Sequence, residues 1–437
     1  MKMKIFLRTL IILVFAVVKT NAQDLLTVEN AVKIALENNY EIRVSANDLK
    51  VDEQNVSIGN AGMLPILQAT ISDNKSHQNT TQTRLDGTVN TLNNAQNNSL
   101  NYGVGLDWTI FDGFRMFALH DQLKELKKVG EAELKLTILT KVSSVITTYY
   151  DLVQQKQQLT AMDTAIAISE QRLMTAENRY KIGKASKLEV LNAKVDINTD
   201  TTNLLRQKEL NANTKILLNQ ILARDPNTPF HVMDSIVMEN VLILPDLVEL
   251  AQEQNPQLQI AQMNKRVLEL ELKQVKANRY PTVSVNTGYN FAESQSSLGF
   301  TTQSSSKGFN YGFSASLNLF DGFNQRRNEK VAALMIQNSQ LTYEQQTQAI
   351  TTQLSTAYQT YLTNLLLIEV EKKNEEIAKE NLDITMAKFK IGTITPIEFR
   401  TAQLNYVNAR VRNSNAQYLA KLSEITLKEL AGNLKLE

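Results

Sequence analysis

Several segments of the chain alternate between apolar and polar residues, which is the pattern of β-strands. Apolar side chains occupy nearly every second position over residues 102–110 in the first half of the chain, and over 283–291 and 311–319 in the second half. Runs of about 9–11 residues with one apolar side suit a tilted strand that crosses a membrane. A soluble antiparallel sheet with one wet face has the same pattern and remains an alternative. We expect two strands in each half of the chain, joined by polar loops at 72–99 and 293–307.

Between these segments, apolar residues recur at helical spacing over very long stretches. Residues 114–180 contain no proline, and a helix of this length would measure ~100 Å. A seven-residue apolar repeat within it predicts coiled-coil packing. Its members are Ile138, Val145, Leu152, Leu159, Ile166, Leu173 and Tyr180. Shorter helices are expected over 27–61 and 186–223, and their summed length of about 109 Å nearly matches the long helix, which predicts a tall helical cylinder.

The chain contains an internal duplication. The motif Ala-x-Glu-x-Asn at 35–39 recurs at 251–255, 216 residues later, and Phe-Asp-Gly-Phe at 111–114 recurs at 320–323, 209 residues later. We therefore expect a first repeat, 24–223, a linker, 224–243, and a second repeat, 244–437. Each repeat is predicted to contain a helix, two strands, a very long helix, a turn and a final helix.

A duplicated motif marks the passage from the second strand of each repeat to the long helix. It consists of Phe111, Asp112 and Gly113 in the first repeat and of Phe320, Asp321 and Gly322 in the second. An aspartate at such a position can accept a hydrogen bond from the first helical turn. We expect helix caps here, with an ion site as the alternative.

A second duplicated motif marks the far end of each long helix. Gly183 and Gly392 are expected to end the helices as left-handed residues. Three residues after each glycine a capping box begins, in which a hydroxyl and a glutamate cap one another's backbone. The two boxes pair Ser186 with Glu189 and Thr395 with Glu398. Each repeat should therefore contain a tight hairpin of two helices.

The N-terminus has the features of a secretory signal peptide. Basic residues are followed by an apolar run at 10–18 and by small residues before a cut after residue 22. The run is too short to span a bilayer as a helix, and a membrane anchor is the alternative. We expect a signal peptide over 1–22. No later stretch approaches 18 apolar residues, so any membrane-crossing segment is expected to be a strand.

Charge and composition argue against several classes of protein. The 46 basic and 45 acidic residues lack the excess of positive charge typical of a nucleic-acid-binding protein. The absence of cysteine excludes disulfides, thiolate metal sites and a lipidated N-terminal cysteine. The three histidines are scattered. Since no nucleophile–base pair, metal cluster or phosphate loop is recognisable, we expect neither catalytic residues nor a metal, a cofactor or an enzymatic activity.

Taken together, the duplicated motifs resemble those of TolC-like outer-membrane efflux proteins, the outer membrane factors, over essentially the whole mature chain. The resemblance implies an α+β membrane protein that assembles as a homotrimer. Each protomer would give four strands to one twelve-stranded transmembrane β-barrel, surrounded by outer-membrane lipid. A long periplasmic α-helical barrel would continue it.

The resemblance also implies a function. The protein would be a passive duct of a tripartite efflux or type I secretion system, docked with a periplasmic adaptor (membrane fusion) protein and an inner-membrane pump of the RND or ABC type. The alternative is an exported trimeric coiled-coil protein with a structural or adhesive role.

In this family, polar ties near the hairpin turns close the duct. They involve an aromatic residue three before the turn glycine, a basic residue two after it in the second repeat, and an acid six after it. The corresponding residues are Tyr180 and Phe389, Ile394, and Glu189 and Glu398. Because Phe389 lacks a hydroxyl and Ile394 lacks a charge, we expect the gate to rest more on the first repeat and on packing. Capping and packing alone are the alternative role for these residues.

Overall fold

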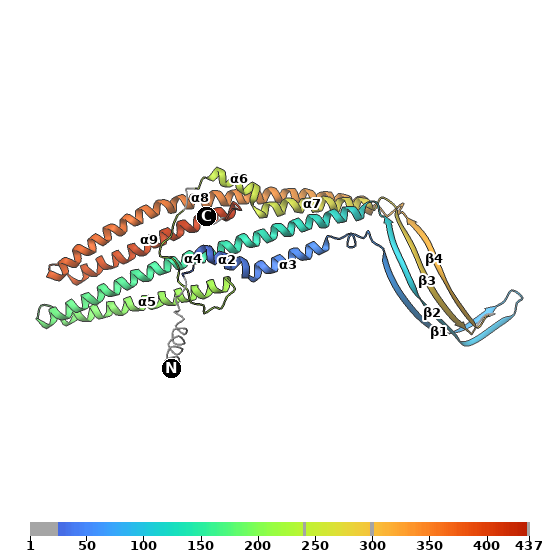
Figure 1. Ribbon diagram of the computed structural model, residues 1–437, viewed down its shortest axis with the longest axis horizontal. Coiled ribbons are helices and arrows are strands. Elements are labelled where there is room, and N and C mark those ends of the chain that lie inside the picture. Colours follow the sequence, from blue (N-terminus) through green and yellow to red (C-terminus); the bar gives the residue numbers. More distant parts are fainter. Residues whose placement is uncertain (1–24, 239–241, 298–300, 435–437) are drawn as a thin grey trace, which may run out of the picture. The chain divides into compact units, whose positions relative to one another are not determined.

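The computed structural model describes residues 25–238, 242–297 and 301–434, so the predicted signal peptide, 1–22, lies outside the described residues. The elements in chain order are α2 (Val28–Asn38), α3 (Tyr40–Asn55), β1 (Ile66–Thr83), β2 (Val89–Phe111), α4 (Arg115–Lys181), α5 (Lys187–Ile221), α6 (Leu244–Gln254), α7 (Pro256–Ala277), β3 (Thr282–Ser296), β4 (Gln303–Ser316), α8 (Asn324–Ile391) and α9 (Pro396–Leu430) (Figure 1). Both halves thus have the order helix, helix, strand, strand, long helix, helix. None of the helices described has a stretch apolar and long enough to pass through a membrane.

The chain forms two compact units. Unit 1 combines residues up to Ser45 with Leu134–Pro256 and the residues from Thr347 onward, and unit 2 combines Ala46–Glu133 with Gln257–Gln346. Both units draw on both halves of the chain, because α4 and α8 each have one part in either unit. The boundaries of the repeats, 24–223 and 244–437, and of the linker, 224–243, stay a prediction.

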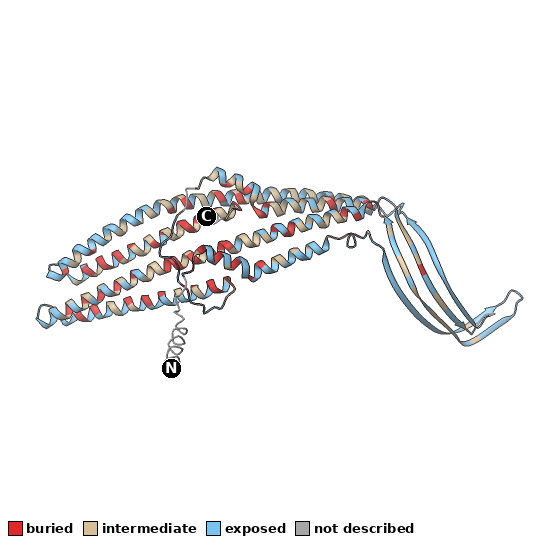
Figure 2. Ribbon diagram, viewed as in Figure 1, coloured by how far each residue is buried: buried red, intermediate tan, exposed pale blue. Residues whose placement is uncertain are grey.

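Unit 2 contains one antiparallel sheet with the strand order β1-β2-β3-β4. Its register places apolar residues side by side on one face, where Tyr102 pairs with Phe291 and Val104 with Tyr289. The same face carries Leu67, Ile71, Leu106, Val285, Phe309, Tyr311 and Phe313. Much of the sheet is exposed (Figure 2), and Tyr311 and Phe313 are 82% and 81% exposed. The sheet is therefore amphipathic, as the alternation predicts, and its apolar face is uncovered in the chain alone.

The strands are much longer than the alternating segments, so the expected polar loops were wrong. β1 and β2 have 18 and 23 residues, and their pairing continues from Ser72↔Asn101 to Thr83↔Val89. Likewise, β3 ends only at Ser296 and β4 begins at Gln303. The ladder joins backbone groups, which polar residues supply as well as apolar ones. Polar side chains also pair across it, as the Oγ1 atoms of Thr81 and Thr91 do at 3.2 Å.

Each predicted first helix is broken by an asparagine, so the single helix expected over 27–61 was also wrong. Asn39 separates α2 from α3, and Asn255 separates α6 from α7. The side chain of Asn39 accepts hydrogen bonds from the first backbone N–H groups of α3 and donates one to Ile221 O at 2.8 Å. Asn255 donates equivalently to Leu430 O at 2.8 Å. The repeated asparagine thus links each helix break to the end of α5 or α9.

The core of unit 1 lies along α4. Val145 and Leu152 are fully buried against α2 and the end of α5, as the seven-residue repeat predicts. Farther along, the prediction was wrong for Tyr180, which is 47% exposed. The buried positions there are Ala161, Ala165, Ser169, Arg172 and Ala176. A straight helix drifts by about 20° per seven residues, so late members of the repeat turn away from the contact. In α8, the positions related to this repeat behave similarly: Leu354, Tyr361, Leu382 and Phe389 are buried, and Ile368 is half-buried.

Candidate functional site at the hairpin ends

The aspartates of the strand-to-helix motifs cap the long helices, as predicted. Asp112 Oδ2 accepts a hydrogen bond from Met116 N at 3.0 Å, and Asp321 Oδ2 accepts one from Gln325 N at 2.7 Å. The motif forms a strained turn, because the residues that follow each aspartate have positive φ. These are Gly113 (71°), Phe114 (68°), Gly322 (70°) and Phe323 (64°). The helices therefore begin at 115 and 324, and the first of them begins one residue later than expected.

Close contacts surround Gly113 and the phenylalanines of this motif. A side chain on Gly113 would place its Cβ 2.4 Å from Ala277 O, so only glycine fits there. The rings of Phe111 and Phe114 meet edge to face with centroids 5.4 Å apart, and Phe320 and Phe323 repeat this contact at 5.4 Å. Across the ranges the structure describes, no group of three or more histidine or acidic side chains is arranged to hold a metal ion.

The two hairpin turns have the same backbone geometry. Gly183 and Gly392 are left-handed, with φ of 75° and 82°, as predicted. Lys184 N donates to Arg179 O at 2.8 Å, and Thr393 N donates to Lys388 O at 3.0 Å. This six-residue hydrogen bond is the Schellman ending of a helix. The glycines therefore set the turns at which α4 folds back into α5 and α8 into α9 (Figure 1).

The capping boxes differ between the repeats. In the second repeat the box is complete, because Thr395 Oγ1 accepts from Glu398 N at 3.2 Å and Glu398 Oε2 accepts from Thr395 N at 2.9 Å. In the first repeat, only Ser186 Oγ accepts a hydrogen bond, from Glu189 N at 3.4 Å. The box predicted there is therefore incomplete. The carboxylate of Glu189 instead lies beside a residue of α4.

That residue is Arg179, in the last turn of α4. Its Nη1 lies 3.7 Å from Glu189 Oε1, and its guanidinium lies 5.7 Å from the centre of the Phe389 ring at the end of α8. Phe389 is 1% exposed and stacks on Phe399, with ring centroids 4.9 Å apart. Arg179 thus pairs with Glu189 within the first hairpin and reaches the second hairpin through one cation–π contact, each weak by itself.

Arg179 supplies a contact at the end of the second hairpin, where Phe389 and Ile394 depart from the family pattern. The ring of Phe389 presents a face to a cation where a tyrosine would present a hydroxyl, and Ile394 packs with the apolar cluster around Phe389. The structure does not bring Tyr180 into this contact. Sequence reasoning missed Arg179, although its position next to the turn motif and its charge were available signals.

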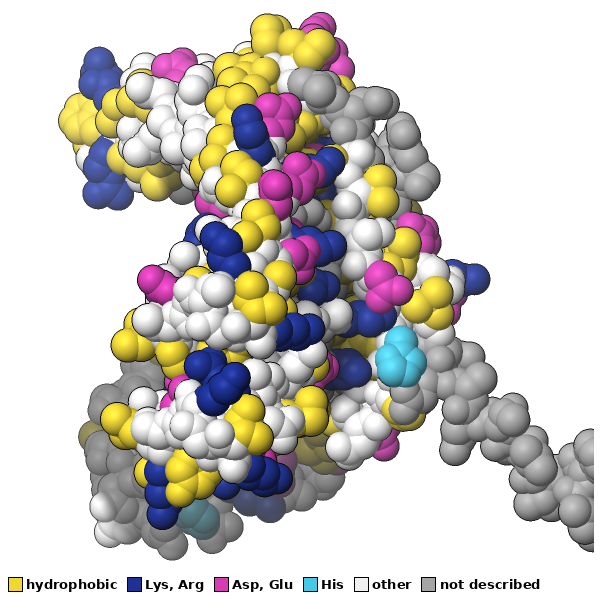
Figure 3. All heavy atoms as spheres, turned by 90° about the vertical axis from the view of Figure 1, so that its left-hand side faces the viewer, with side chains coloured by type: hydrophobic (Ala, Val, Ile, Leu, Met, Phe, Trp, Pro, Cys, Tyr) yellow, Lys and Arg dark blue, Asp and Glu magenta, His cyan; other side chains and the backbone are white. Residues whose placement is uncertain are grey.

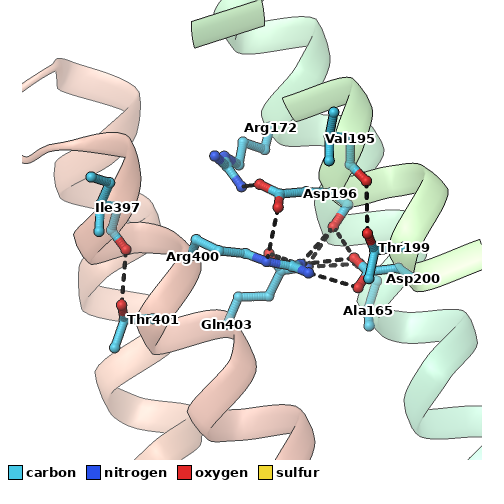
Figure 4. Close-up of polar contacts among 11 residues, drawn as sticks. Ala165, Arg172, Val195, Asp196, Thr199, Asp200, Ile397, Arg400, Thr401 and Gln403 are labelled. Atoms are coloured by element: carbon cyan, nitrogen blue, oxygen red, sulfur yellow. Dashed lines mark hydrogen bonds and ion pairs between the residues drawn. The ribbon is translucent and has the colours of Figure 1, made fainter. Parts of the chain in front are cut away.

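A buried polar network ties the hairpins together farther from the turns (Figure 4). Arg400 of α9 donates to both carboxylate oxygens of Asp200 of α5, each at 2.8 Å. The side chains of Arg400 and Asp200 are only 14% and 8% exposed. Burial lowers the pKa of Arg400, but the hydrogen bonds and charges of Asp200 and Asp196 outweigh it, so the net shift is upward.

Side chains of α4, α5 and α9 complete the network. Ser169 Oγ donates to Asp200 Oδ2 at 2.7 Å, and Gln403 Nε2 donates to Ser169 Oγ at 2.8 Å. Arg172, which is 4% exposed, pairs with Asp196, and Asp196 also lies 3.6 Å from Arg400 Nε. Two arginines and two aspartates thus lie at a contact of α4 and α5 with α9, all within unit 1.

The duplication does not extend to this network. Positions 209 residues away replace its charged members with neutral ones. Arg172 corresponds to Asn381, Asp196 to Asn405, Asp200 to Ala409 and Arg400 to Leu191. The charged tie therefore belongs to one of the two related helix contacts, and similarity between the repeats could not have revealed it.

An amphipathic sheet of duplicated strands and two helical hairpins tied at their ends define the class of TolC-like outer-membrane channels. The chain belongs to the outer membrane efflux protein family, whose model matches residues 31–224 and 247–433. It is thus an efflux protein of the outer membrane. The predictions of family, compartment and transport role are confirmed.

Solved structures share the fold. The CmeC outer-membrane channel of Campylobacter jejuni has 17% sequence identity and a TM-score of 0.78, over 93% of this chain and 85% of that chain. The outer-membrane channel OprN has 14% identity and a TM-score of 0.77, over 93% and 90%. The outer membrane protein VceC of Vibrio cholerae has 15% identity and a TM-score of 0.73, over 93% and 96%. A comparison with curated proteins finds no sequence match.

Proposed function

We propose that this protein is the outer-membrane duct of a tripartite efflux system. It works as a homotrimer and passively conducts substrates, without catalysis, from an inner-membrane pump through the periplasm to the exterior. A periplasmic adaptor docks at the hairpin ends. The family match favours this role over a coiled-coil adhesin and, by its description as an efflux protein, over type I secretion.

Two features of the sheet support a trimer built around one barrel. Among the described residues, β1 and β4 pair on one side only, which leaves long edges of 18 and 14 residues. Such edges are prone to pair with other strands unless they are covered. Three chains of four strands would join their edges and close a twelve-stranded barrel, with the exposed apolar face toward lipid.

A charge on the apolar face tests this assembly. Leu106→Arg places a cation toward lipid, where it costs about 2–4 kcal/mol near the midplane, and should lower the yield of trimer in the outer membrane. Asp107→Arg is the matched control, because the neighbouring residue points to the other face. Equal trimer yields from both variants would count against a lipid-facing sheet.

The contacts at the hairpin ends support a closed gate that can open. We assign the gate to Tyr180, Gly183, Ser186, Glu189, Phe389, Gly392, Thr395 and Glu398, and we add Arg179. A gate needs contacts between the hairpins that break at low cost, and the single cation–π contact between Arg179 and Phe389 is of this kind. The buried network around Arg400 is stronger and keeps the hairpins aligned when the ends part.

The single observation that carries the proposal is the family match over both halves of the chain. Recording of the purified protein in a planar lipid bilayer tests it. We expect discrete single-channel conductance, low in the resting state. A protein that inserts into the bilayer as a trimer but never conducts would refute the duct.

A further inference from the structure

The hairpin ends are strongly basic, although the whole chain has nearly equal numbers of basic and acidic residues. We call residues 177–189 and 388–398 the tips. The tips contain six basic and three acidic residues, against 46 and 45 in the whole sequence. Positive charge is thus concentrated at the place where the proposed function requires a partner to bind.

The acids of the tips are already engaged, whereas most of the bases are not. Glu177 pairs with Lys194 at 3.5 Å, Glu189 lies beside Arg179, and Glu398 completes a capping box. Five lysines are exposed and form no ion pair with any residue that the structure describes. They are Lys181, Lys184, Lys187, Lys388 and Lys390. The surface left for a partner is therefore cationic.

Exposed aliphatic side chains lie among these lysines, and they are duplicated. Ile182 and Leu188 at the first tip are 67% and 64% exposed, and their counterparts Ile391 and Ile397 at the second tip are 75% and 77% exposed. Figure 3, which shows the side of the molecule where the hairpins end, has yellow hydrophobic side chains next to dark blue basic ones. Each tip thus offers a pair of aliphatic side chains with lysines around it.

We propose that the tips bind an acidic partner protein whose apolar side chains contact Ile182, Leu188, Ile391 and Ile397, while its carboxylates meet the five lysines. This inference rests on the proposed function and names the chemistry of its adaptor. Apolar contacts at the centre of an interface supply most of its affinity. Charges at the rim speed association and exclude wrong partners, in a way that salt weakens.

Other occupants fit these observations less well. A second copy of the same tips would bring like charges together, which opposes binding. A membrane surface is usually contacted through aromatic and larger apolar faces, whereas each of these tips presents two exposed aliphatic side chains. An acidic protein with apolar side chains therefore fits best.

Binding of synthetic probes to the purified full-length protein tests the proposal. The acidic probe is a helical hairpin peptide with leucines at its turn and glutamates around them, and the basic probe has lysines in place of the glutamates. The protein variant is Lys181→Gln, Lys184→Gln and Lys187→Gln together. Its matched control is Lys208→Gln, Lys372→Gln and Lys373→Gln, three exposed lysines of unit 1 outside the tips.

We expect the acidic probe to bind and the basic probe not to bind. The tip variant should bind the acidic probe at least about tenfold more weakly, since each exposed charge pair contributes up to about fivefold in affinity, and the control variant should match the wild type. Equal binding of both probes, or no loss in the tip variant, would overturn the proposal. Binding to phosphatidylglycerol vesicles without binding to the acidic probe would also overturn it and assign the tips to lipid.

The outcome is separate from that of the proposed function. Conductance of the wild-type protein decides whether it is a duct, and the contrast between the two probes decides the chemistry of its partner. A conducting protein that prefers the basic probe would support the proposed duct and refute the acidic partner. A protein that prefers the acidic probe but never conducts would refute the duct.

Discussion

At the end of the second hairpin, the carboxylate of Glu398 accepts a hydrogen bond from the backbone of its own cap, whereas at the end of the first, Glu189 lies beside Arg179 instead. The two turns share their left-handed glycine and their six-residue hydrogen bond. The second box is thus complete, whereas the glutamate of the first lies beside Arg179 of its own hairpin, and Arg179 in turn contacts Phe389 of the second hairpin. Turns with the same backbone geometry can therefore make different side-chain contacts. The two repeats share the turn but not the charged contact.

The two repeats also differ farther from the turns. Arg400, Asp200, Arg172 and Asp196 form a buried charged contact that the related positions of the other repeat lack. A buried ion pair adds little net stability, but loss of one partner is costly because the other charge stays buried alone. The contact is therefore better understood as fixing the alignment of α9 against α4 and α5 than as a general source of stability.

The largest effect is expected from removing one partner of this network. Arg400→Leu leaves Asp200 buried without its cation and should lower the free energy of unfolding by about 3–5 kcal/mol. Urea denaturation of the purified protein measures it. Leu191→Ala, at the related and half-exposed position of the first repeat, should change stability by less than about 1 kcal/mol.

A double variant separates charge from packing in this network. Arg400→Leu combined with Asp200→Leu removes both charges and should recover much of the loss, because paired removal of buried ions is often nearly neutral. If the double variant is no more stable than Arg400→Leu alone, the loss comes from packing. The difference between the two related helix contacts then has no electrostatic basis.

The turns should respond equally in the two repeats. Gly183→Val and Gly392→Val each force a β-branched residue into positive φ, which costs about 1–2 kcal/mol. Thermal unfolding followed by circular dichroism measures both. Gly308→Val is the control, since Gly308 has ordinary φ and no atom near the added Cβ. A loss confined to one of the two turns would show that the turns do not depend equally on a left-handed glycine.

The caps should respond unequally. Thr395→Ala breaks a complete capping box and should cost about 0.5–2 kcal/mol. Ser186→Ala removes a single hydrogen bond of 3.4 Å and should cost less. Hydrogen exchange of the first amides of α5 and α9 reports each local loss. An equal or larger loss in the first repeat would contradict the difference between the two boxes.

Local chemistry made much of the fold predictable. The caps by Asp112 and Asp321, the left-handed glycines and the complete box at Thr395 all join residues within five positions, so sequence spacing alone specifies them. The long helices and the alternating faces of the strands follow in the same way from their periods. These features define the hairpin ends, where the candidate site lies.

The contacts within the site could not be predicted in this way. Arg179 meets Phe389, and Arg400 meets Asp200, across about two hundred residues of chain. Only the packing of hairpins decides which charges face one another. Strand ends were missed for another reason, because backbone pairing continues through residues such as Asn97 and Ser99 that have no apolar pattern. The asparagine breaks at 39 and 255 depend likewise on distant carbonyl groups.

The smallest effect on stability, and the most direct test, concerns Arg179. Its loss should cost about 1 kcal/mol, between the values for exposed and for desolvated cation–π contacts, because Arg179 is partly buried, but it should loosen the closed gate. Arg206→Ala is the matched control, because Arg206 is exposed and forms no ion pair within the described part of the chain.

The decisive measurement is single-channel conductance of the wild type, Arg179→Ala and Arg206→Ala in a planar lipid bilayer. If the duct is closed through Arg179, Arg179→Ala should conduct severalfold more, or open more often, than the wild type, and Arg206→Ala should match the wild type. Equal conductance of all three proteins would contradict a gate that depends on Arg179.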